Sequence, residues 1–380
     1  MERKIKIPLN LQFRIYFSLV ITLALFISIY VALYYIGIYF TDMIPIGYIL
    51  VGVGVIPLIF ALSTKSNDRG FALKQEKFPK FIKVIKEVSQ EIGVRMPDEI
   101  QILPTEEIYV TGLFRRKIGV GIAGLRSISS EEFKSILAHE FGHFYGKDTI
   151  VGTLLAKIQI SLEKSSKFGK AWWDVIPLAE LAIVGLFIAG FAKGYSFIFR
   201  VIISIYSRQV EYRADYIASH FISKETFGRG LVNYLAYTVY FESVGYNSVI
   251  SLLSQGKRFV NIYKSINDAY VEEDHSKIKQ TVVDNEKTRL FSSHPSLSKR
   301  LSAIGLSKLD LKSKEKKDAL LLLDHYEELE KQMTATLTDY MRVNLLYQDA
   351  VAREGKCRYC GEQFEQLNEL LEHESKHNVN

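Results

Sequence analysis

Two long apolar runs dominate the first sixty residues of the chain. Residues 15–40 form an uncharged run, and residues 44–62 form a second one after a three-residue linker. A helix of about 20 apolar residues spans the roughly 30 Å hydrocarbon core of a bilayer. The pattern therefore predicts a transmembrane hairpin over residues 1–64. A cleaved signal peptide is the alternative for the first run, but the run is too long for a signal-peptide core and lacks a small-x-small cleavage site.

A second apolar stretch covers residues 175–206 and predicts another membrane hairpin, over residues 171–207, with its tip at Lys193-Gly194. Its second leg, residues 195–206, would extend only about 18 Å as a helix, at 1.5 Å per residue. A buried hairpin inside a soluble domain is the alternative interpretation. Two charged residues of the stretch should face protein or water rather than lipid: Glu180 and Arg200.

Basic residues flank the first hairpin on both sides, and the turn between its legs has none. By the positive-inside rule, the N-terminus and everything after residue 63 then lie in the cytoplasm. The second hairpin is flanked in the same way. We therefore expect a multi-pass protein of the cell membrane, with the active site and both termini cytoplasmic. The flanking residues are Arg3, Lys4, Lys6, Arg14, Lys65, Arg69, Lys74, Lys77, Lys80, Lys164, Lys167, Lys170, Arg208 and Arg213.

The remaining chain combines amphipathic helices with short strands. Ser129 with Glu132 three positions later matches a capping box, and the apolar positions that follow recur at helical spacing through residue 145. Further helices are expected over 78–92, 208–222 and 313–353, and strands over 98–103 and 117–123. The soluble region is thus divided into residues 65–170 and 208–305, followed by a charged helical extension at 306–355 and a terminal module at 356–380.

Composition and charge exclude several classes of protein. Hydrophobic residues make up 48% and charged residues 24%, which excludes a long disordered or collagen-like chain. The net charge of +6 and the sequence pI near 8.9 are too weak to indicate a nucleic-acid partner by themselves. The chain has two cysteines, Cys357 and Cys360, which excludes a disulfide scaffold. Their spacing indicates metal ligands instead.

The capped helix contains the sequence His139-Glu140-Phe141-Gly142-His143, an HExxH motif. Histidines at i and i+4 share one helical face, where both imidazoles can reach one cation. Zinc lowers the pKa of a water molecule bound to it toward about 7. Glu140 can accept a proton from that water as it attacks a peptide carbonyl. The alternative is a solvated helix face with two unrelated histidines, but capping and amphipathicity place the motif on a real helix.

A catalytic zinc site needs a third protein ligand and an open position. The best candidates follow the second apolar stretch, where Glu211 and Asp215 lie at i and i+4 and share one helical face. One carboxylate can bind the metal while the other accepts an N–H from a ligand histidine and fixes its tautomer. Acidic pairs are common on solvated helices, so this signal depends on the HExxH motif.

Taken together, HEFGH, an apolar hairpin, SRQVEYRAD and SSHPSLSKRL at residues 292–301 resemble the HtpX-type membrane zinc endopeptidases, over about residues 10–305. The CAAX prenyl proteases belong to the same superfamily. The resemblance implies zinc ligands at His139, His143 and Glu211, with Glu140 as the general base. It also implies a zincin-like metalloprotease domain, split by a membrane hairpin, in a mainly α-helical membrane protein with a small β-sheet.

The same resemblance gives roles to two further residues. Asp215 matches the second carboxylate of the family, which supports a ligand histidine. His294 matches a His-Pro segment near the family's C-terminal end and is expected to bind substrate or stabilise the oxyanion; a surface histidine before a proline turn is the alternative. The region at residues 109–114 departs from the family's usual stretch, so subsite preference is not carried over. We expect the strand at Gly119–Ala123 to pair with an extended peptide or protein substrate.

The terminal module has the full spacing of a two-Cys two-His zinc finger of ββα fold, with a small apolar core at Phe364 and Leu370. Its expected ligands to a structural zinc ion are Cys357, Cys360, His373 and His377. From residue 357 onward the sequence has two basic and five acidic residues, so the module carries a net negative charge and should repel phosphate. We therefore expect a protein partner, and nucleic acid is disfavoured. A disordered tail is the alternative.

The sequence predicts a membrane-embedded zinc endopeptidase that hydrolyses membrane or misfolded proteins, with one catalytic and one structural zinc ion. The quality-control role is implied by the resemblance alone. Two alternatives are a catalytically silent membrane scaffold that recruits partners through its finger, and a prenyl-protein protease. The intact positions His139, Glu140, His143 and Glu211 argue against the scaffold.

Overall fold

The expected capping box is present in the computed structural model of the chain and opens helix α5 (Ser130–Tyr145). The Ser129 backbone N–H donates to the Glu132 carboxylate at 2.9 Å, and the Ser129 hydroxyl accepts from the Glu132 backbone N–H at 3.3 Å. These bonds fix where the helix starts. The structure describes residues 5–41, 70–112, 115–175, 179–272, 278–279, 282, 294–306, 318–352, 356–357, 360–364, 369–370, 372–373 and 376.

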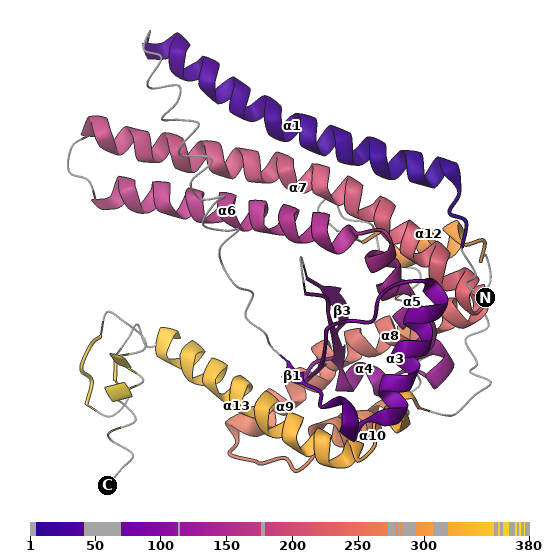
Figure 1. Cartoon of the computed structure of the whole chain (residues 1–380). Helices are drawn as coiled ribbons and strands as arrows, with labels where there is room; N and C mark the ends of the chain where they lie inside the picture. The colour runs from indigo at the N-terminus through magenta and orange to yellow at the C-terminus, as the bar shows by residue number, and fades with distance from the viewer. Residues whose placement is uncertain are drawn as a thin grey trace.

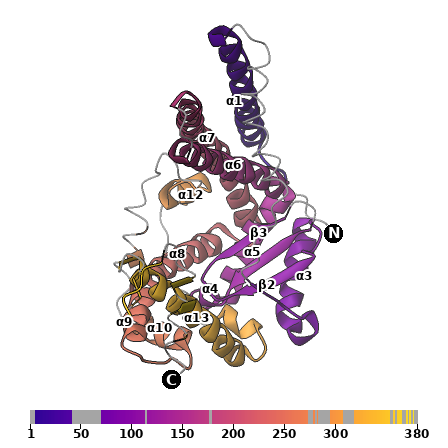
Figure 2. The same cartoon turned by 90° about the vertical axis from the view of Figure 1, so that its left-hand side faces the viewer.

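A four-stranded sheet lies beside α5 (Figure 2). Its strand order is β1-β2-β4-β3. Strand β1 (Phe71–Ala72) pairs antiparallel with β2 (Glu99–Leu103), and β2 pairs parallel with β4 (Lys117–Gly121). Strand β3 (Ile108–Thr111) pairs antiparallel with the other side of β4. The two expected strands are confirmed as β2 and β4, although the second ends at Gly121.

This strand order corrects the expected substrate strand. Both edges of β4 are hydrogen-bonded to neighbouring strands, so the segment Gly119–Ala123 has no edge to offer a peptide. Residues 122 and 123 instead begin the short helix α4 (Ile122–Arg126). The sequence shows β4 as an apolar strand but cannot show that β3, which precedes it in the chain, occupies its outer side. The edge strand on this side of the described sheet is β3.

Three long helices lie side by side along one end of the molecule: α1 (Leu9–Thr41), α6 (Asp148–Val175) and α7 (Ala179–Phe221) (Figure 1). Buried side chains from all three form a separate apolar cluster where the helices meet. Its buried members are Ile15, Leu155, Ile158, Tyr195, Phe199, Tyr206 and Val210.

The expected hairpin tip at Lys193-Gly194 is wrong, because α7 continues through both residues and also includes the helix expected at 208–222. A glycine inside a helix costs about 1 kcal/mol relative to alanine. Burial of Tyr195 and Phe199 against α1 and α6 outweighs that cost. The lysines expected to precede the hairpin lie within its first leg, α6: Lys164, Lys167 and Lys170.

The part of the chain that the structure describes contains no helix that is both long enough and apolar enough to cross a membrane. The second expected span, residues 44–62, lies outside the described residues.

The remaining helices complete the main core together with α3 (Pro79–Ile92), which confirms the expected helix at 78–92. Helix α13 (Tyr326–Ala352) confirms most of the helix expected at 313–353. The other elements are the 3-10 turns η1 (Gln75–Lys77) and η3 (Ala319–Leu322), the π-helical turn η2 (Phe241–Gly245), and helices α8 (Lys224–Tyr240), α9 (Tyr246–Ser254), α10 (Ile262–Glu272) and α12 (Leu297–Ala303).

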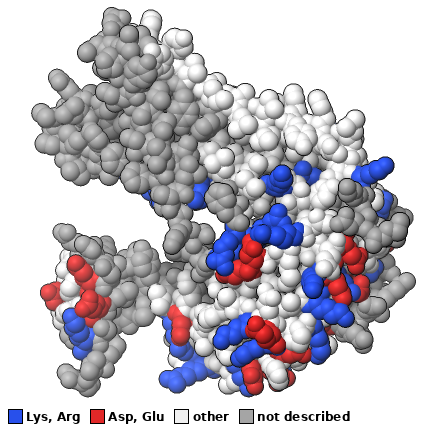
Figure 3. Space-filling model, in the orientation of Figure 1, with Lys and Arg blue, Asp and Glu red and all other residues white. Residues whose placement is uncertain are grey.

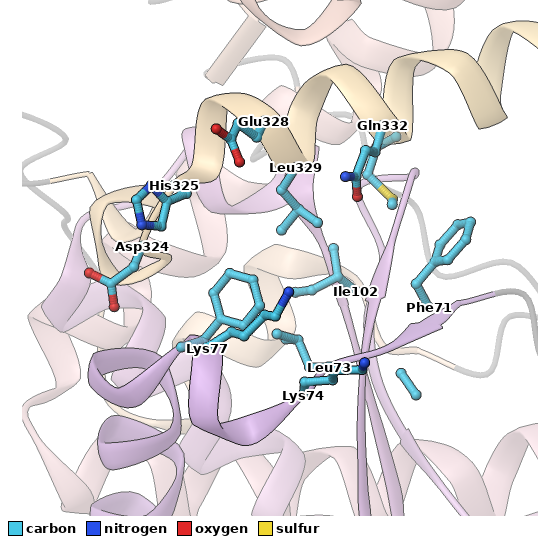
Figure 4. Close-up of a pocket in the computed structure, with 13 residues that line it drawn as sticks. Phe71, Leu73, Lys74, Lys77, Ile102, Asp324, His325, Glu328, Leu329 and Gln332 are labelled. Atoms are coloured by element: carbon cyan, nitrogen blue, oxygen red, sulfur yellow. The ribbon is translucent and has the colours of Figure 1, made fainter.

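A cavity of about 570 Å³ separates the start of α13 from the sheet edge at β1 (Figure 4). Its apolar lining includes Leu73 and Ile102 on the sheet side and Leu329 of α13. Lys74 and Lys77 lie on its β1 side, and its α13 side carries Asp324, His325 and Glu328. This cavity lies at the sheet edge opposite β3.

Glu106 lies in the connection between β2 and β3, with its side chain largely buried. The Tyr234 hydroxyl donates to the Glu106 carbonyl at 3.1 Å and accepts from the Ile108 N–H at 3.0 Å. Burial, together with the nearby carboxylates of Glu242 and Glu107, raises the pKa of Glu106 to about 7. The folded protein therefore holds a proton on Glu106 in a pH range where the unfolded chain has lost it.

We predict that the Glu106→Gln variant is more stable than the wild type at pH 8. The folded-state pKa is raised, so the contribution of Glu106 to stability is complete below about pH 4.5 and is lost as pH rises through about 7. The loss is at most about 3 kcal/mol. Thermal unfolding of both proteins at pH 5 and pH 8 measures it. A variant with no advantage at pH 8 would contradict the assignment.

Candidate metal centre

The two histidines of the HExxH motif lie on the same face of α5, as their spacing predicts. Their rings are 5.0 Å apart between centroids and nearly perpendicular, at 89°. The opposite face of the helix packs into the main core through fully buried Phe133, Leu137 and Phe141. Burial of that face fixes the rotation of the helix and directs His139 and His143 toward α7.

Helix α7 supplies Glu211 by passing very close to α5. A Cβ atom on Gly142 would lie 3.0 Å from the Ala214 Cα atom, so the residue between the two histidines has to be small for this crossing. Glu211 lies about one turn before Ala214 and is 5% exposed. Close packing of two helices therefore joins the two motifs, which are far apart in the sequence.

The three side chains place their donor atoms as zinc requires. His139 Nε2 is 3.6 Å from one Glu211 carboxylate oxygen, and His143 Nε2 is 3.5 Å from the other. Zinc binds nitrogen and oxygen at about 2.0–2.2 Å in tetrahedral geometry, which puts two ligand atoms about 3.3–3.5 Å apart. The donor atoms all lie within 4.8 Å of one another. The residues therefore fit one zinc ion.

Asp215 supports His139 from the side away from the metal site. The His139 Nδ1 atom is 3.0 Å from the Asp215 carboxylate, which leaves Nε2 directed at Glu211. Asp215 is fully buried, and Arg300 donates two hydrogen bonds to it, at 2.9 Å and 2.6 Å. The structure thus places Asp215 where the sequence predicted it, whereas Arg300, which lies beyond the His-Pro segment, was not expected to contribute.

A buried aspartate and arginine support His143 in the same way. Its Nδ1 atom is 3.4 Å from the Asp148 carboxylate, and Arg213 forms a buried ion pair with Asp148. A Cβ atom on Gly146 would lie 1.8 Å from the Arg213 guanidinium, so the glycine leaves the space that the arginine fills. Neither Asp148 nor Arg213 was predicted from the sequence to support the histidines. The only sequence signal for this pair is the position of Asp148 itself, five residues after His143 at the start of the next helix.

His294 also reaches this centre. Its Nδ1 atom is 3.0 Å from the Glu211 carboxylate, and 60% of its side chain is exposed. The structure therefore brings His139, His143, Glu211, Asp215 and His294 together, and the charges of three of them, with that of Glu211, act on the Glu140 carboxylate. His294 is thus partly in solvent and next to the carboxylate of a candidate metal ligand.

Mutual interactions shift the protonation of these groups. Burial would raise the pKa of Glu211, but the hydrogen bond from His294 and nearby positive charges hold it well below its ordinary range. Burial raises the pKa of Glu140. Burial opposes protonation of His143, yet its bond to Asp148 and the adjacent carboxylates raise its pKa to about 9. Without a metal the centre therefore holds a proton that a bound cation would replace.

A second cluster of potential metal ligands lies in the C-terminal module. The donor atoms of Cys357, Cys360 and His373 lie within 4.8 Å of one another. The Cys357 N–H donates to the Glu362 carbonyl at 2.8 Å, in a turn whose glycine, Gly361, has a φ of +77°. The apolar side chains expected as its core, Phe364 and Leu370, pack with Cys357. The fourth predicted ligand, His377, lies outside the described residues.

The three candidate metal ligands lie within the part of the chain that a protein-family model matches. A model of the family described as Peptidase family M48 matches residues 75–306. A protease HtpX homologue from Pelotomaculum thermopropionicum is 24% identical over 271 residues, which cover 68% of this chain and 87% of that protein. Shorter matches are a protease HtpX homologue of Thermococcus sibiricus (28% over 92 residues, 23% of this chain and 31% of that protein) and a protease HtpX of Pseudomonas entomophila (25% over 160 residues, 37% and 50%).

Among solved structures, the crystal structure of S. mikatae Ste24p is similar with a TM-score of 0.33 and 15% sequence identity. The match covers 78% of this chain and 66% of that one. The C-terminal module and the first long helix both lie outside the region that the family model matches.

We predict that Asp148→Asn weakens zinc binding at the centre by about 10- to 100-fold, because an amide holds the His143 ring less firmly than a carboxylate does. Competition with a fluorescent chelator measures the affinity, in a chain whose Cys357 and Cys360 are both serine so that one site is titrated. Asp339→Asn on the exposed surface of α13 is the matched control. Equal affinities for the two variants would show that Asp148 does not support His143.

Proposed function

The chain belongs to peptidase family M48, and on that basis we propose that it is a zinc-dependent endopeptidase. One observation carries the proposal: two imidazoles of α5 and the Glu211 carboxylate of α7 direct their donor atoms at one point, at separations that suit tetrahedral zinc. The proposed ligands are His139, His143 and Glu211, and the proposed base is Glu140.

A bound zinc ion would polarise the substrate carbonyl and lower the pKa of water to about 7. Glu140 lies on the same helix, next to His139, and its raised pKa suits a group that accepts a proton and then passes it to the leaving amine. Asp215 and Asp148 hold the two histidines with Nδ1 directed outward, so that each Nε2 is presented at the centre. His294, 3.0 Å from the Glu211 carboxylate, is proposed to donate a hydrogen bond to the reacting carbonyl.

Substrates are proposed to bind as extended strands along β3. The Glu107 carbonyl accepts from Gly121 of β4, and main-chain groups alternate along a strand, so Ile108 and Val110 face away from β4. The Ile108 N–H already donates to the Tyr234 hydroxyl. Val110 is therefore the residue of β3 whose outward-facing main-chain groups we propose to pair with a substrate. Val110 lines one cavity together with His143 and Glu211. A peptide paired there would run directly past the proposed metal site.

We propose that α1, α6 and α7 contact lipid. Large apolar side chains are exposed on all three helices, and few charged side chains cover the described part of α1 in Figure 3. Main-chain pairing on β3 is insensitive to sequence, which suits membrane or misfolded proteins as substrates. The cytoplasmic orientation predicted from the flanking basic residues is part of the same proposal. Examples of the exposed side chains are Phe13, Phe17, Val20, Ile27, Ile150, Leu154, Phe197 and Ile198.

The C-terminal module is proposed to hold a structural zinc ion through Cys357, Cys360, His373 and His377. A segment this short cannot bury enough apolar surface to fold unaided, so metal binding would supply its folding free energy. Its excess of acidic side chains favours a protein partner over nucleic acid.

We predict that Glu140→Gln abolishes proteolysis and leaves zinc bound. The amide cannot accept the proton of the attacking water, and the three ligands are unchanged. Casein cleavage by the detergent-purified protein, measured beside metal content, tests this. Cleavage by the variant at the wild-type rate would show that Glu140 is not the base.

Zinc counting distinguishes the peptidase from a catalytically silent scaffold. We expect two zinc ions per wild-type chain and one in Glu211→Ala, because that variant loses a ligand of the α5–α7 centre only. Replacing both Cys357 and Cys360 with serine should also leave one ion, but with cleavage preserved. A single ion in the wild type, lost only with the cysteines, would support the scaffold.

A further inference from the structure

A groove leads away from the metal centre along the contact between α6 and α7. Two cavities form it, of about 340 and 260 Å³, and they share Gly152, Ala156 and Ser207. The first is lined by His143 and Glu211 at the metal centre and by Val110 of β3. The second continues to Arg200. We refer to the two cavities together as the α6–α7 groove.

Small side chains create this groove. Gly152 and Ala156 lie one turn apart on α6, and Ser204 and Ser207 lie on the facing part of α7. Packing does not explain the glycine, because a Cβ atom on Gly152 would meet no atom within 4 Å. A glycine inside a helix also costs about 1 kcal/mol. The effect of Gly152 is therefore to leave the groove open where the two cavities meet.

A basic side chain, Arg200, lies at the far end of the groove. Arg200 lines the second cavity, whereas Glu163, whose carboxylate is 3.5 Å from the Arg200 guanidinium, does not. Both side chains are about half exposed, at 51% and 49%. An exposed ion pair of this kind contributes little stability, so a substrate carboxylate can take the place of Glu163. Gln159 donates to the Glu163 carboxylate at 2.9 Å and can hold it aside.

We propose that the α6–α7 groove binds the substrate on one side of the scissile bond and selects an acidic side chain next to Arg200. This inference rests on the proposed peptidase function. Arg200 and Glu211 are eleven residues apart on one helix, or about 16 Å at 1.5 Å per residue. An extended peptide covers that distance in about five residues, at roughly 3.3 Å each. The selected residue is therefore the fourth to sixth from the cleaved bond, on one side only.

The test compares cleavage sites in a proteome-derived peptide library for the wild type and three variants, with zinc content measured for each. Gly152→Leu fills the groove, and Gly194→Leu is its control: Gly194 is also exposed on a long helix, a Cβ atom there meets nothing within 4 Å, and it lines neither cavity. Arg200→Glu reverses the charge at the far end.

We expect the wild type and Gly194→Leu to enrich Asp and Glu severalfold at the fourth to sixth position on one side. Arg200→Glu should replace that enrichment with Lys and Arg. Gly152→Leu should bind zinc normally, cleave long peptides at least about tenfold more slowly, and cleave peptides truncated on that side at the wild-type rate.

Identical cleavage profiles for the wild type, Gly152→Leu and Arg200→Glu would overturn the groove assignment and leave the peptidase intact. A zinc-loaded wild type that cleaves nothing in the library would instead overturn the proposed peptidase and, with it, the groove as a substrate site.

Discussion

The contact between α5 and α7 at Gly142 and Ala214 is the constraint on which the rest of the structure depends. It places the Glu211 carboxylate between the Nε2 atoms of His139 and His143, at 3.6 and 3.5 Å. A Cβ atom at position 142 would already be in tight contact with Ala214, so a larger side chain would force the two helices to shift and would disturb the alignment of the carboxylate with the imidazoles. The proposed metal centre is thus a product of helix packing rather than of a single motif.

The orientation of the two histidines depends on a second layer of charges. Each ring is backed by an aspartate, and each aspartate by a buried arginine: Asp215 with Arg300, and Asp148 with Arg213. A buried carboxylate is costly unless it is paired and hydrogen-bonded. Each arginine therefore pairs a buried carboxylate with a positive charge, and the carboxylates in turn fix which ring nitrogen faces the centre.

The sequence predicted the parts of this centre that have local signals. The capping box at Ser129 located the motif helix, and the i, i+4 spacings of the histidines and of Glu211 and Asp215 placed each pair on one face. Arg213 and Arg300 carry no local signal, because only the folded chain brings them to the two aspartates, and Asp148 has only the weak signal of an acid five positions after His143. The continuous α7 was missed for a related reason: Lys193-Gly194 has the composition of a turn, and tertiary packing of Tyr195 and Phe199 overrides it.

Anomalous diffraction at the zinc edge, from crystals of the full chain, tests the central claim most directly. The account predicts a peak within about 2.0–2.2 Å of His139 Nε2, His143 Nε2 and a Glu211 carboxylate oxygen. A zinc-loaded crystal with no peak among these three side chains, or with Glu211 turned away from the ion, would contradict it.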